Sequence, residues 1–287
     1  MLRTRLLTAL VLLGVLLPAL FRAPQWLWAA LGTLMVVAAA WEWTGLLRAS
    51  KIQRVLFPMA FLSVCVAILW VDPSSAWLLQ KPDDPYVRLH GGIWNGPLYG
   101  ISILFWLGVV PFWLRSKWVL SARNGWFLNG LGWGVGFVLL LPPWLALLHL
   151  RAVDAPLLLA VLAVAWVADV AAYFAGRRWG KHKLAPTISP GKTWEGAAGA
   201  LAGILILGAV LAFMTPYALP VFPMVLGLCL LTVVSILGDL FESMIKRQAG
   251  LKDSSQLLPG HGGVLDRVDS LTSTLPLAAM LLLWIFP

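Results

Sequence analysis

Long apolar segments recur along the whole chain and dominate what it can fold into. A helix needs roughly 20 apolar residues to cross the hydrocarbon core of a bilayer. Candidates for such helices lie at about residues 5–21, 25–47, 52–71, 97–114, 126–149, 156–175, 196–214, 221–241 and 270–286. The sequence therefore predicts an all-α polytopic membrane protein with about nine transmembrane helices.

The composition supports membrane insertion. Of the 287 residues, 60% are hydrophobic and only 11% are charged, whereas about a quarter of a typical soluble domain is charged. We expect one integral membrane domain over 1–287, with N-terminal spans in 1–150 and C-terminal spans with the catalytic loops in 151–287. Cys65 and Cys229 lie in apolar segments, where we expect packed thiols and not a disulfide or metal site.

The distribution of positive charge predicts the orientation. With the N-terminus inside, 17 of the 21 Lys and Arg residues fall on inside segments. Cytoplasmic loops carry such an excess. We therefore expect a bacterial inner-membrane protein with a cytoplasmic N-terminus and a periplasmic C-terminus, and the net charge of +9 needs no nucleic-acid partner. A cleaved signal peptide is the alternative for the first span, since Arg3 and Arg5 precede an apolar run.

Two inside loops, 176–195 and 238–269, combine cations, hydroxyls, glycines and carboxylates. In the second, Asp239 and Glu242 share a helix face at the end of one span, and Asp266 and Asp269 repeat this spacing before the next. Such carboxylates can converge on hard divalent cations, which prefer oxygen ligands. Alternatively, Asp266 and Asp269 favour a helix N-terminus, and Asp239 pairs with Lys246 or Arg247.

Phosphate-binding groups lie between these acids. Lys246, Arg247 and Lys252 precede the segment 259–263, which includes His261, Gly262 and Gly263. Glycines let backbone N–H groups approach an anion, and the following helix start favours negative charge. This combination suits phosphoryl transfer. His261 could donate to phosphate, act as an acid or base, or serve only as a hydrogen-bonded loop residue.

The first loop contains Ser189, Lys192 and Thr193. Gly-Lys-Thr invites comparison with a P-loop, but Pro186 replaces the earlier glycine and no strand is expected before it. One cation and two hydroxyls still suit phosphate. A purely structural loop with a helix start at Thr193 is the alternative.

Asp169 lies within a predicted span, with Tyr173 on the same helix face. An ionisable residue inside a span is a functional candidate by default. A structural ion pair with a loop arginine is the other interpretation.

The second loop resembles the motif of the phosphatidate cytidylyltransferases (CDP-diacylglycerol synthases). The likeness spans residues 243–269 without departure, and the Asp169 region and residues 189–196 are also similar to that family. The matching positions are Ser243, Ile245, Lys246, Arg247, Lys252, Asp253, Ser255, Leu258, Pro259, His261, Gly262, Gly263, Val264, Asp266, Arg267, Val268 and Asp269.

The resemblance implies that CTP and phosphatidic acid give CDP-diacylglycerol and pyrophosphate, with Mg²⁺ as cofactor and two cations per site as one option. It implies Asp239, Asp266 and Asp269 as metal ligands and as catalytic residues with Lys246 and Arg247. Substrate contacts are then expected from Ser189, Lys192, Thr193, Lys252, His261, Gly262, Gly263 and Asp169.

Two other functions remain open at this point. A polyprenol or dolichol kinase would use a similar bundle but release a nucleoside diphosphate. A transporter would place its ionisable residues near mid-bilayer, whereas here they concentrate on one face. The oligomeric state is also open, a homodimer included.

Overall fold

The computed structural model describes residues 2–78, 90–116, 126–214 and 221–285. The chain is mostly helical. Its helices are α1 (Leu2–Arg22), α2 (Gln25–Leu46), α3 (Gln53–Val71), the 3₁₀ turn η1 (Pro73–Ser75), α5 (Asn95–Leu104), the π-helical η2 (Phe105–Val109), α6 (Val110–Ser116), α7 (Trp126–Val153), α8 (Ala155–Trp179), α9 (Trp194–Met214), α10 (Val221–Gln248), α11 (Leu265–Val268) and α12 (Leu271–Ile285).

Each of the nine predicted apolar segments coincides with a helix, one of them with the continuous run from α5 through η2 to α6. Seven helical segments of the described residues are long and apolar enough to cross a membrane. This confirms a polytopic helical membrane protein. The apolar part described for α1, Leu13–Arg22, and the 15-residue α12 are shorter, so nine crossings remain a prediction.

The expectation of an all-α chain is wrong at one place. Strand β1 (Lys183–Ala185) pairs antiparallel with β2 (Ser189–Thr193), with Lys183 opposite Thr193 and Ala185 opposite Ser189. The expectation that no strand precedes the Gly-Lys-Thr segment is therefore also wrong. This polar stretch lies between two helices, and its backbone groups find partners across the hairpin.

Helix α10 continues past its predicted end at residue 241 as far as Gln248, so Lys246 and Arg247 are helical and not loop residues. The extra turns bury Met244 and Ile245 in the core. Cations in the last turn are also favoured by the helix dipole. Gly250, with φ of +69°, then turns the chain away in a conformation that glycine adopts readily.

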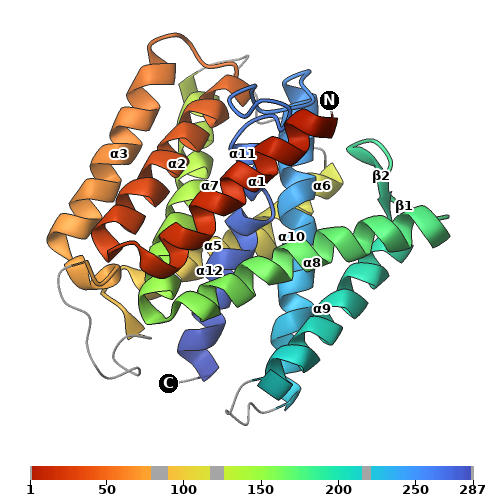
Figure 1. Ribbon diagram of the computed structural model, residues 1–287. Helices are drawn as coiled ribbons and strands as arrows, with labels where there is room; N and C mark the ends of the chain where they lie inside the picture. The colour runs from red at the N-terminus through yellow and green to blue at the C-terminus, as the bar shows by residue number, and fades with distance from the viewer. Residues whose placement is uncertain (1, 79–89, 117–125, 215–220, 286–287) are drawn as a thin grey trace.

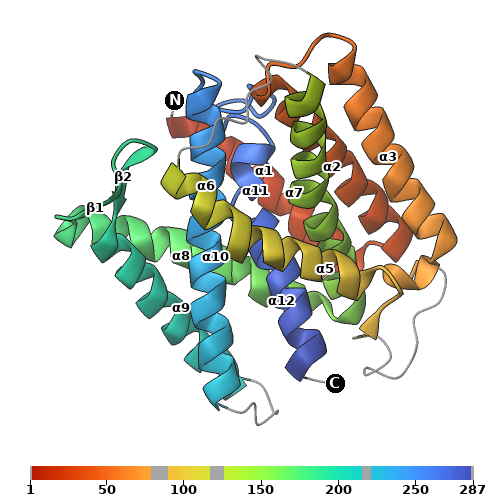
Figure 2. The ribbon, with the colours of Figure 1, turned by 180° about the vertical axis from the view of Figure 1, so that it is seen from behind.

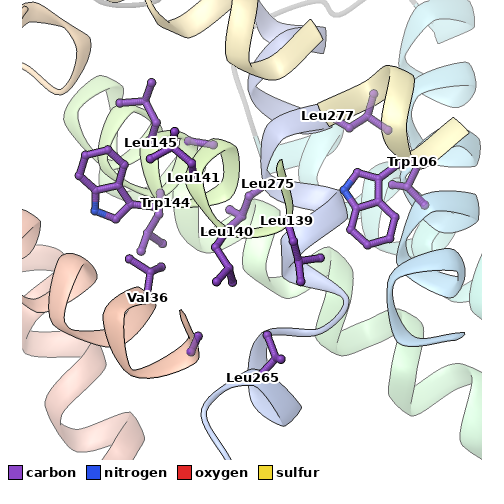
Figure 3. Close-up of a cluster of buried hydrophobic side chains, with 14 of the residues drawn as sticks. Val36, Trp106, Leu139, Leu140, Leu141, Trp144, Leu145, Leu265, Leu275 and Leu277 are labelled. Atoms are coloured by element: carbon purple, nitrogen blue, oxygen red, sulfur yellow. The ribbon is translucent and has the colours of Figure 1, made fainter. Parts of the chain in front are cut away.

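The bundle places α2, α3 and α7 on one side and α9 and α10 on the other, with α12 between them, and α8 crosses from the end of α7 to the hairpin (Figure 1). Small residues let α8 and α9 approach closely, as is common between membrane helices. A Cβ atom at Gly203 would lie 2.7 Å from Cβ of Ala171, and one at Gly199 would overlap Ala175. Leucines of α7 and α12 form the buried centre, and Leu265 of α11 points toward them (Figure 3).

The two ends of the bundle differ. The hairpin, the loop before α11, the α2–α3 turn and the start of α1 lie at one end, and the end of α12 lies at the other (Figures 1 and 2). This is the relative placement that the orientation prediction requires. Which end faces the cytoplasm remains a prediction, and part of its charge count, including Lys81, Arg88, Lys117 and Arg123, falls outside the described residues.

Candidate active site

A pocket of about 460 Å³ lies between α8, α9, α10 and the hairpin. Five of the predicted site residues line it, and they come from three separate segments of the chain. They are Asp169 of α8, Ser189, Lys192 and Thr193 of β2, and Asp239 of α10. Alanines and glycines of α8 and α9 form much of the remaining wall, so the pocket is lined by both polar and small apolar residues.

Lys192 forms an ion pair with Asp239 inside this pocket. Both side chains are partly exposed, with 24% of Lys192 and 29% of Asp239 accessible. The alternative in which Asp239 pairs with a cation of its own loop is therefore not what the structure has. The β hairpin brings Lys192 to α10 across 47 residues of sequence, so the pair links the two predicted catalytic loops.

Thr193 has a structural contact as well as a place in the pocket. Its hydroxyl accepts a hydrogen bond of 3.1 Å from the amide of Gly196, which caps the first turn of α9. Beside it, Glu195 accepts bonds from the backbone and ring of His182, with 2.7 Å to Nδ1, and ties the base of the hairpin to α9. The hairpin is thus fixed at the helix that it precedes.

Asp169 is exposed to the pocket and lies within electrostatic range of Asp239, Lys192 and Arg267. The proposed structural pair with the neighbouring loop arginine is not formed in the described residues, since Arg177 donates to the Tyr173 hydroxyl instead, at 2.8 Å. Tyr173 and Arg177 also line the pocket.

A second group of charges lies further along α10, beyond Asp239 and near the end of the helix. Lys246 lies between Glu242, at 3.2 Å, and Asp266, at 2.7 Å, and all three side chains are largely buried. Hereafter these three residues are called the Lys246 cluster. Burial would raise the pKa of Asp266, but hydrogen bonds from Lys246 and from the amides of Gly263 and Ser254 outweigh it and lower that pKa. Asp266 is therefore held ionised by its partners.

Asp269 connects the two groups of charges. Burial, together with the negative charges of Asp239 and Asp169, raises its pKa to about 7. The approach is possible because residue 238 is glycine: a Cβ there would lie 2.7 Å from the carbonyl oxygen of Asp269. Carboxylates from α8, α10 and the turn between α11 and α12 thus lie within electrostatic range and repel one another.

Three consecutive amides at the end of the glycine-rich segment and the start of α11 bind protein carboxylates. The amide of Gly263 donates to Asp266 at 2.8 Å, and the amides of Val264 and Leu265 donate to Glu42 at 2.9 and 2.7 Å. The Gly263 amide, which was predicted to contact substrate, therefore already has a carboxylate partner, whereas the contact predicted for Gly262 stays a prediction. Gly260 and Gly262 have positive φ, and they allow the tight turn that brings the amides inward.

The other predicted substrate residues do not line the pocket. Arg247 and Lys252 are exposed, and Arg247 donates to the carbonyl of Leu251 at 3.4 Å. His261 is half-buried, and its Nδ1 has no hydrogen-bond partner in the described residues. The roles predicted for these three residues stay predictions.

Glu42 is not among the site residues predicted from the sequence. It lies on α2, in the N-terminal half, and only 1% of it is exposed. The signal was present, because Glu42 is the one charged residue of the 22-residue helix α2, and an acid within a span is a candidate by default.

No three His, Cys, Asp or Glu side chains of the described residues are arranged as a ready metal site. The donor set nonetheless fits a hard cation, because Asp169, Asp239 and Asp269 offer only oxygen atoms and repel one another. Asp266 fits less well, since both its oxygens are engaged by protein donors.

The chain is similar to known proteins along nearly its whole length. The model of the cytidylyltransferase family matches residues 3–285. A phosphatidate cytidylyltransferase of Pseudomonas aeruginosa is 38% identical over 286 residues, which cover 98% of this chain and 97% of that protein. One of Haemophilus influenzae is 37% identical over 291 residues, covering 96% of both chains, and one of Brucella suis is 50% identical over 130 residues, covering 44% of both.

The chain therefore belongs to the cytidylyltransferase family, and it is a nucleotidyltransferase of the membrane.

Proposed function

We propose that the protein transfers the cytidylyl group of CTP to phosphatidic acid and releases pyrophosphate, giving CDP-diacylglycerol for phospholipid synthesis. The relatives that match nearly the full length carry the name of this activity. The observation that carries the proposal is the convergence of Asp169, Lys192 and Asp239 on one pocket at one end of the bundle.

The pocket suits substrates of opposite character. Its polar end offers a cation and the Ser189 and Thr193 hydroxyls, whereas alanines and glycines line the rest of it. A lipid phosphate can enter with its tails among the helices and its head group at the polar end. Lys192, which pairs with Asp239, lines the pocket, so its ammonium group can bind an arriving phosphate.

The chemistry requires little proton transfer. A phosphatidate oxygen, anionic at neutral pH, forms a new bond to the α-phosphorus of CTP. The bond from that phosphorus to the oxygen bridging toward the β-phosphate breaks, and pyrophosphate leaves with the electron pair. The protein contributes positioning and neutralisation of charge, from Lys192 in the pocket, with Lys246 and Arg247 as further predicted cations.

The Lys246 cluster has a distinct part in this scheme. Lys246 is already shared by Glu242 and Asp266. It therefore offsets the negative charge around Asp269 before substrate arrives and fixes the chain that carries Asp269. In this proposal the main role of Asp266 is to hold Lys246 in place. Asp266 could bind a metal ion only if its present hydrogen-bond donors moved away.

We further propose that Mg²⁺ binds beside Asp239 and Asp269, with Asp169 close by. A divalent ion would relieve the repulsion among these carboxylates, and when bound it would neutralise charge on the phosphates. The active end of the bundle is proposed to face the cytoplasm of a bacterium, at its inner membrane, because nucleotides are found there and because the Lys and Arg distribution predicts it.

Purified protein in detergent, incubated with CTP, phosphatidic acid and Mg²⁺, should release pyrophosphate and form CDP-diacylglycerol without any ion gradient. Lipid product analysis distinguishes this from a lipid kinase, which would release a nucleoside diphosphate. If neither pyrophosphate nor CDP-diacylglycerol formed, the proposal would be refuted. Lys192→Met, which keeps the apolar part of the side chain, should lose most of the rate, whereas Lys51→Met on the α2–α3 turn should not.

A further inference from the structure

Glu42 makes four hydrogen bonds to one stretch of chain that is more than 200 residues away. Its Oε1 accepts from the Ser255 hydroxyl at 2.6 Å and from the Val264 amide at 2.9 Å. Its Oε2 accepts from the Leu265 amide at 2.7 Å and from the Ser254 hydroxyl at 3.1 Å. This single carboxylate therefore holds both ends of the 254–265 loop.

No cation of the described residues forms an ion pair with Glu42, although it is only 1% exposed. A buried carboxylate needs hydrogen bonds to compensate for the loss of water. Within the part of the chain that the structure describes, the four hydrogen bonds to the Glu42 side chain all come from this loop.

The loop in turn builds the Lys246 cluster. Ser254 donates from its amide to Asp266 at 2.8 Å, and its hydroxyl lies within 2.9 Å of Asp266 and 3.1 Å of Glu42. Asp266 then holds Lys246 at 2.7 Å. A continuous chain of contacts therefore runs from α2 through Ser254 and Asp266 to the lysine beside the pocket.

Close packing allows little freedom at this junction. A Cβ atom at Gly263 would overlap the Ser254 hydroxyl and lie 2.5 Å from Oε1 of Glu42. Next to these amides, Leu265 is 1% exposed and points into the leucine-rich centre (Figure 3). Glu42, Ser254 and Gly263 are therefore packed tightly against one another at the start of α11.

We propose that Glu42 is a positioning residue for cytidylyl transfer: it fixes the 254–265 loop so that Asp266 holds Lys246 and Asp269 faces Asp239. This inference rests on the proposed function for its catalytic part. It gives the N-terminal half, which carries none of the motif, a defined part in the active site. It also explains why the loop amides face a protein carboxylate and not the pocket.

The test is Glu42→Gln, with Glu42→Asp as the charge-retaining variant. Glutamine has one acceptor oxygen, so its NH₂ group faces a backbone N–H of Val264 or Leu265 in either orientation. We expect kcat to fall at least about tenfold while KM for CTP stays within about twofold, because placement and not substrate contact is lost. Glu42→Asp should recover part of kcat.

A second measurement needs no activity. Lys252 is exposed two residues before the loop, and Lys181 and Lys183 are exposed at the start of the hairpin, so trypsin can cleave the detergent-purified protein at both places. In Glu42→Gln we expect the rate at Lys252, divided by the rate at the hairpin, to rise several-fold. General unfolding would raise both rates and leave this ratio unchanged.

Asp72→Asn is the matched control, because Asp72 is also a buried carboxylate that accepts from Ser75 and from the amide of Ile93. It follows the 19-residue α3, ~28 Å along the bundle from the α2–α3 turn. It should change neither kcat nor the cleavage ratio of folded protein. If Glu42→Gln cannot be recovered folded, Ser255→Ala removes one donor to Glu42 and should shift both measurements in the same direction by less.

Wild-type kcat together with a wild-type cleavage ratio in Glu42→Gln would overturn the inference. A raised KM with unchanged kcat would overturn it too, since it would indicate substrate binding. Failure of the wild-type protein to make CDP-diacylglycerol would instead refute the proposed function, and the cleavage ratio would still decide whether Glu42 holds the loop.

Discussion

Asp266→Asn tests whether the Lys246 cluster supports catalysis. Asp266 accepts from the amides of Ser254 and Gly263 with Oδ2 and from Lys246 with Oδ1. If the asparagine carbonyl faces the two amides, its NH₂ group faces the ammonium of Lys246. The charge-assisted bond is lost, and Lys246 is left with Glu242 as its partner within the cluster.

The size of the effect follows from that bond. A hydrogen bond to a charged group contributes about 1.5–3 kcal/mol. If this energy is used to place the catalytic groups, kcat/KM should fall between about tenfold and about 150-fold, since about 1.4 kcal/mol corresponds to a factor of ten. A larger loss would indicate that Asp266 also contacts the metal or the phosphates.

The assay is the initial rate of pyrophosphate release from CTP and phosphatidic acid in detergent micelles. Gel filtration and far-ultraviolet circular dichroism would establish that the variant is folded. Asp72→Asn again serves as the control, because it changes a comparable buried carboxylate at the C-terminal end of α3, away from the α2–α3 turn. Folded Asp266→Asn protein with wild-type kcat/KM would refute the role assigned to the cluster.

Three further predictions concern the pocket and its walls. Lys192→Ala should raise KM for CTP or phosphatidic acid about tenfold or more, because a phosphate loses its ammonium partner; unchanged substrate curves would return the hairpin to a structural role. EDTA should stop product formation and added Mg²⁺ should restore it, and full activity in excess EDTA would exclude the proposed cofactor. Gly203→Leu should destabilise the protein by about 1–3 kcal/mol, since any side chain there meets Ala171 on α8, whereas the exposed Ala202→Leu should not; equal melting temperatures would contradict the close α8–α9 packing.

The helical segments could be predicted because each one follows from local hydropathy. A run of apolar residues long enough for a span forms a helix wherever it lies, since a bilayer leaves no other partner for the backbone. The hairpin and the extension of α10 could not be predicted in this way. Both are polar segments, in which backbone pairing and the burial of Met244 and Ile245 by neighbouring helices decided the structure.

The motif of residues 243–269 by itself determined the family and the residue types available for phosphate chemistry, because those depend on side-chain identity and spacing. Only the tertiary structure decided the partners. It paired Asp239 with Lys192, gave Lys246 to Glu242 and Asp266, and turned the loop amides toward Glu42. Most of these contacts join segments that are far apart in the chain. For Lys246, several acids lie within reach, and the packing of the helices decides which of them pair with it.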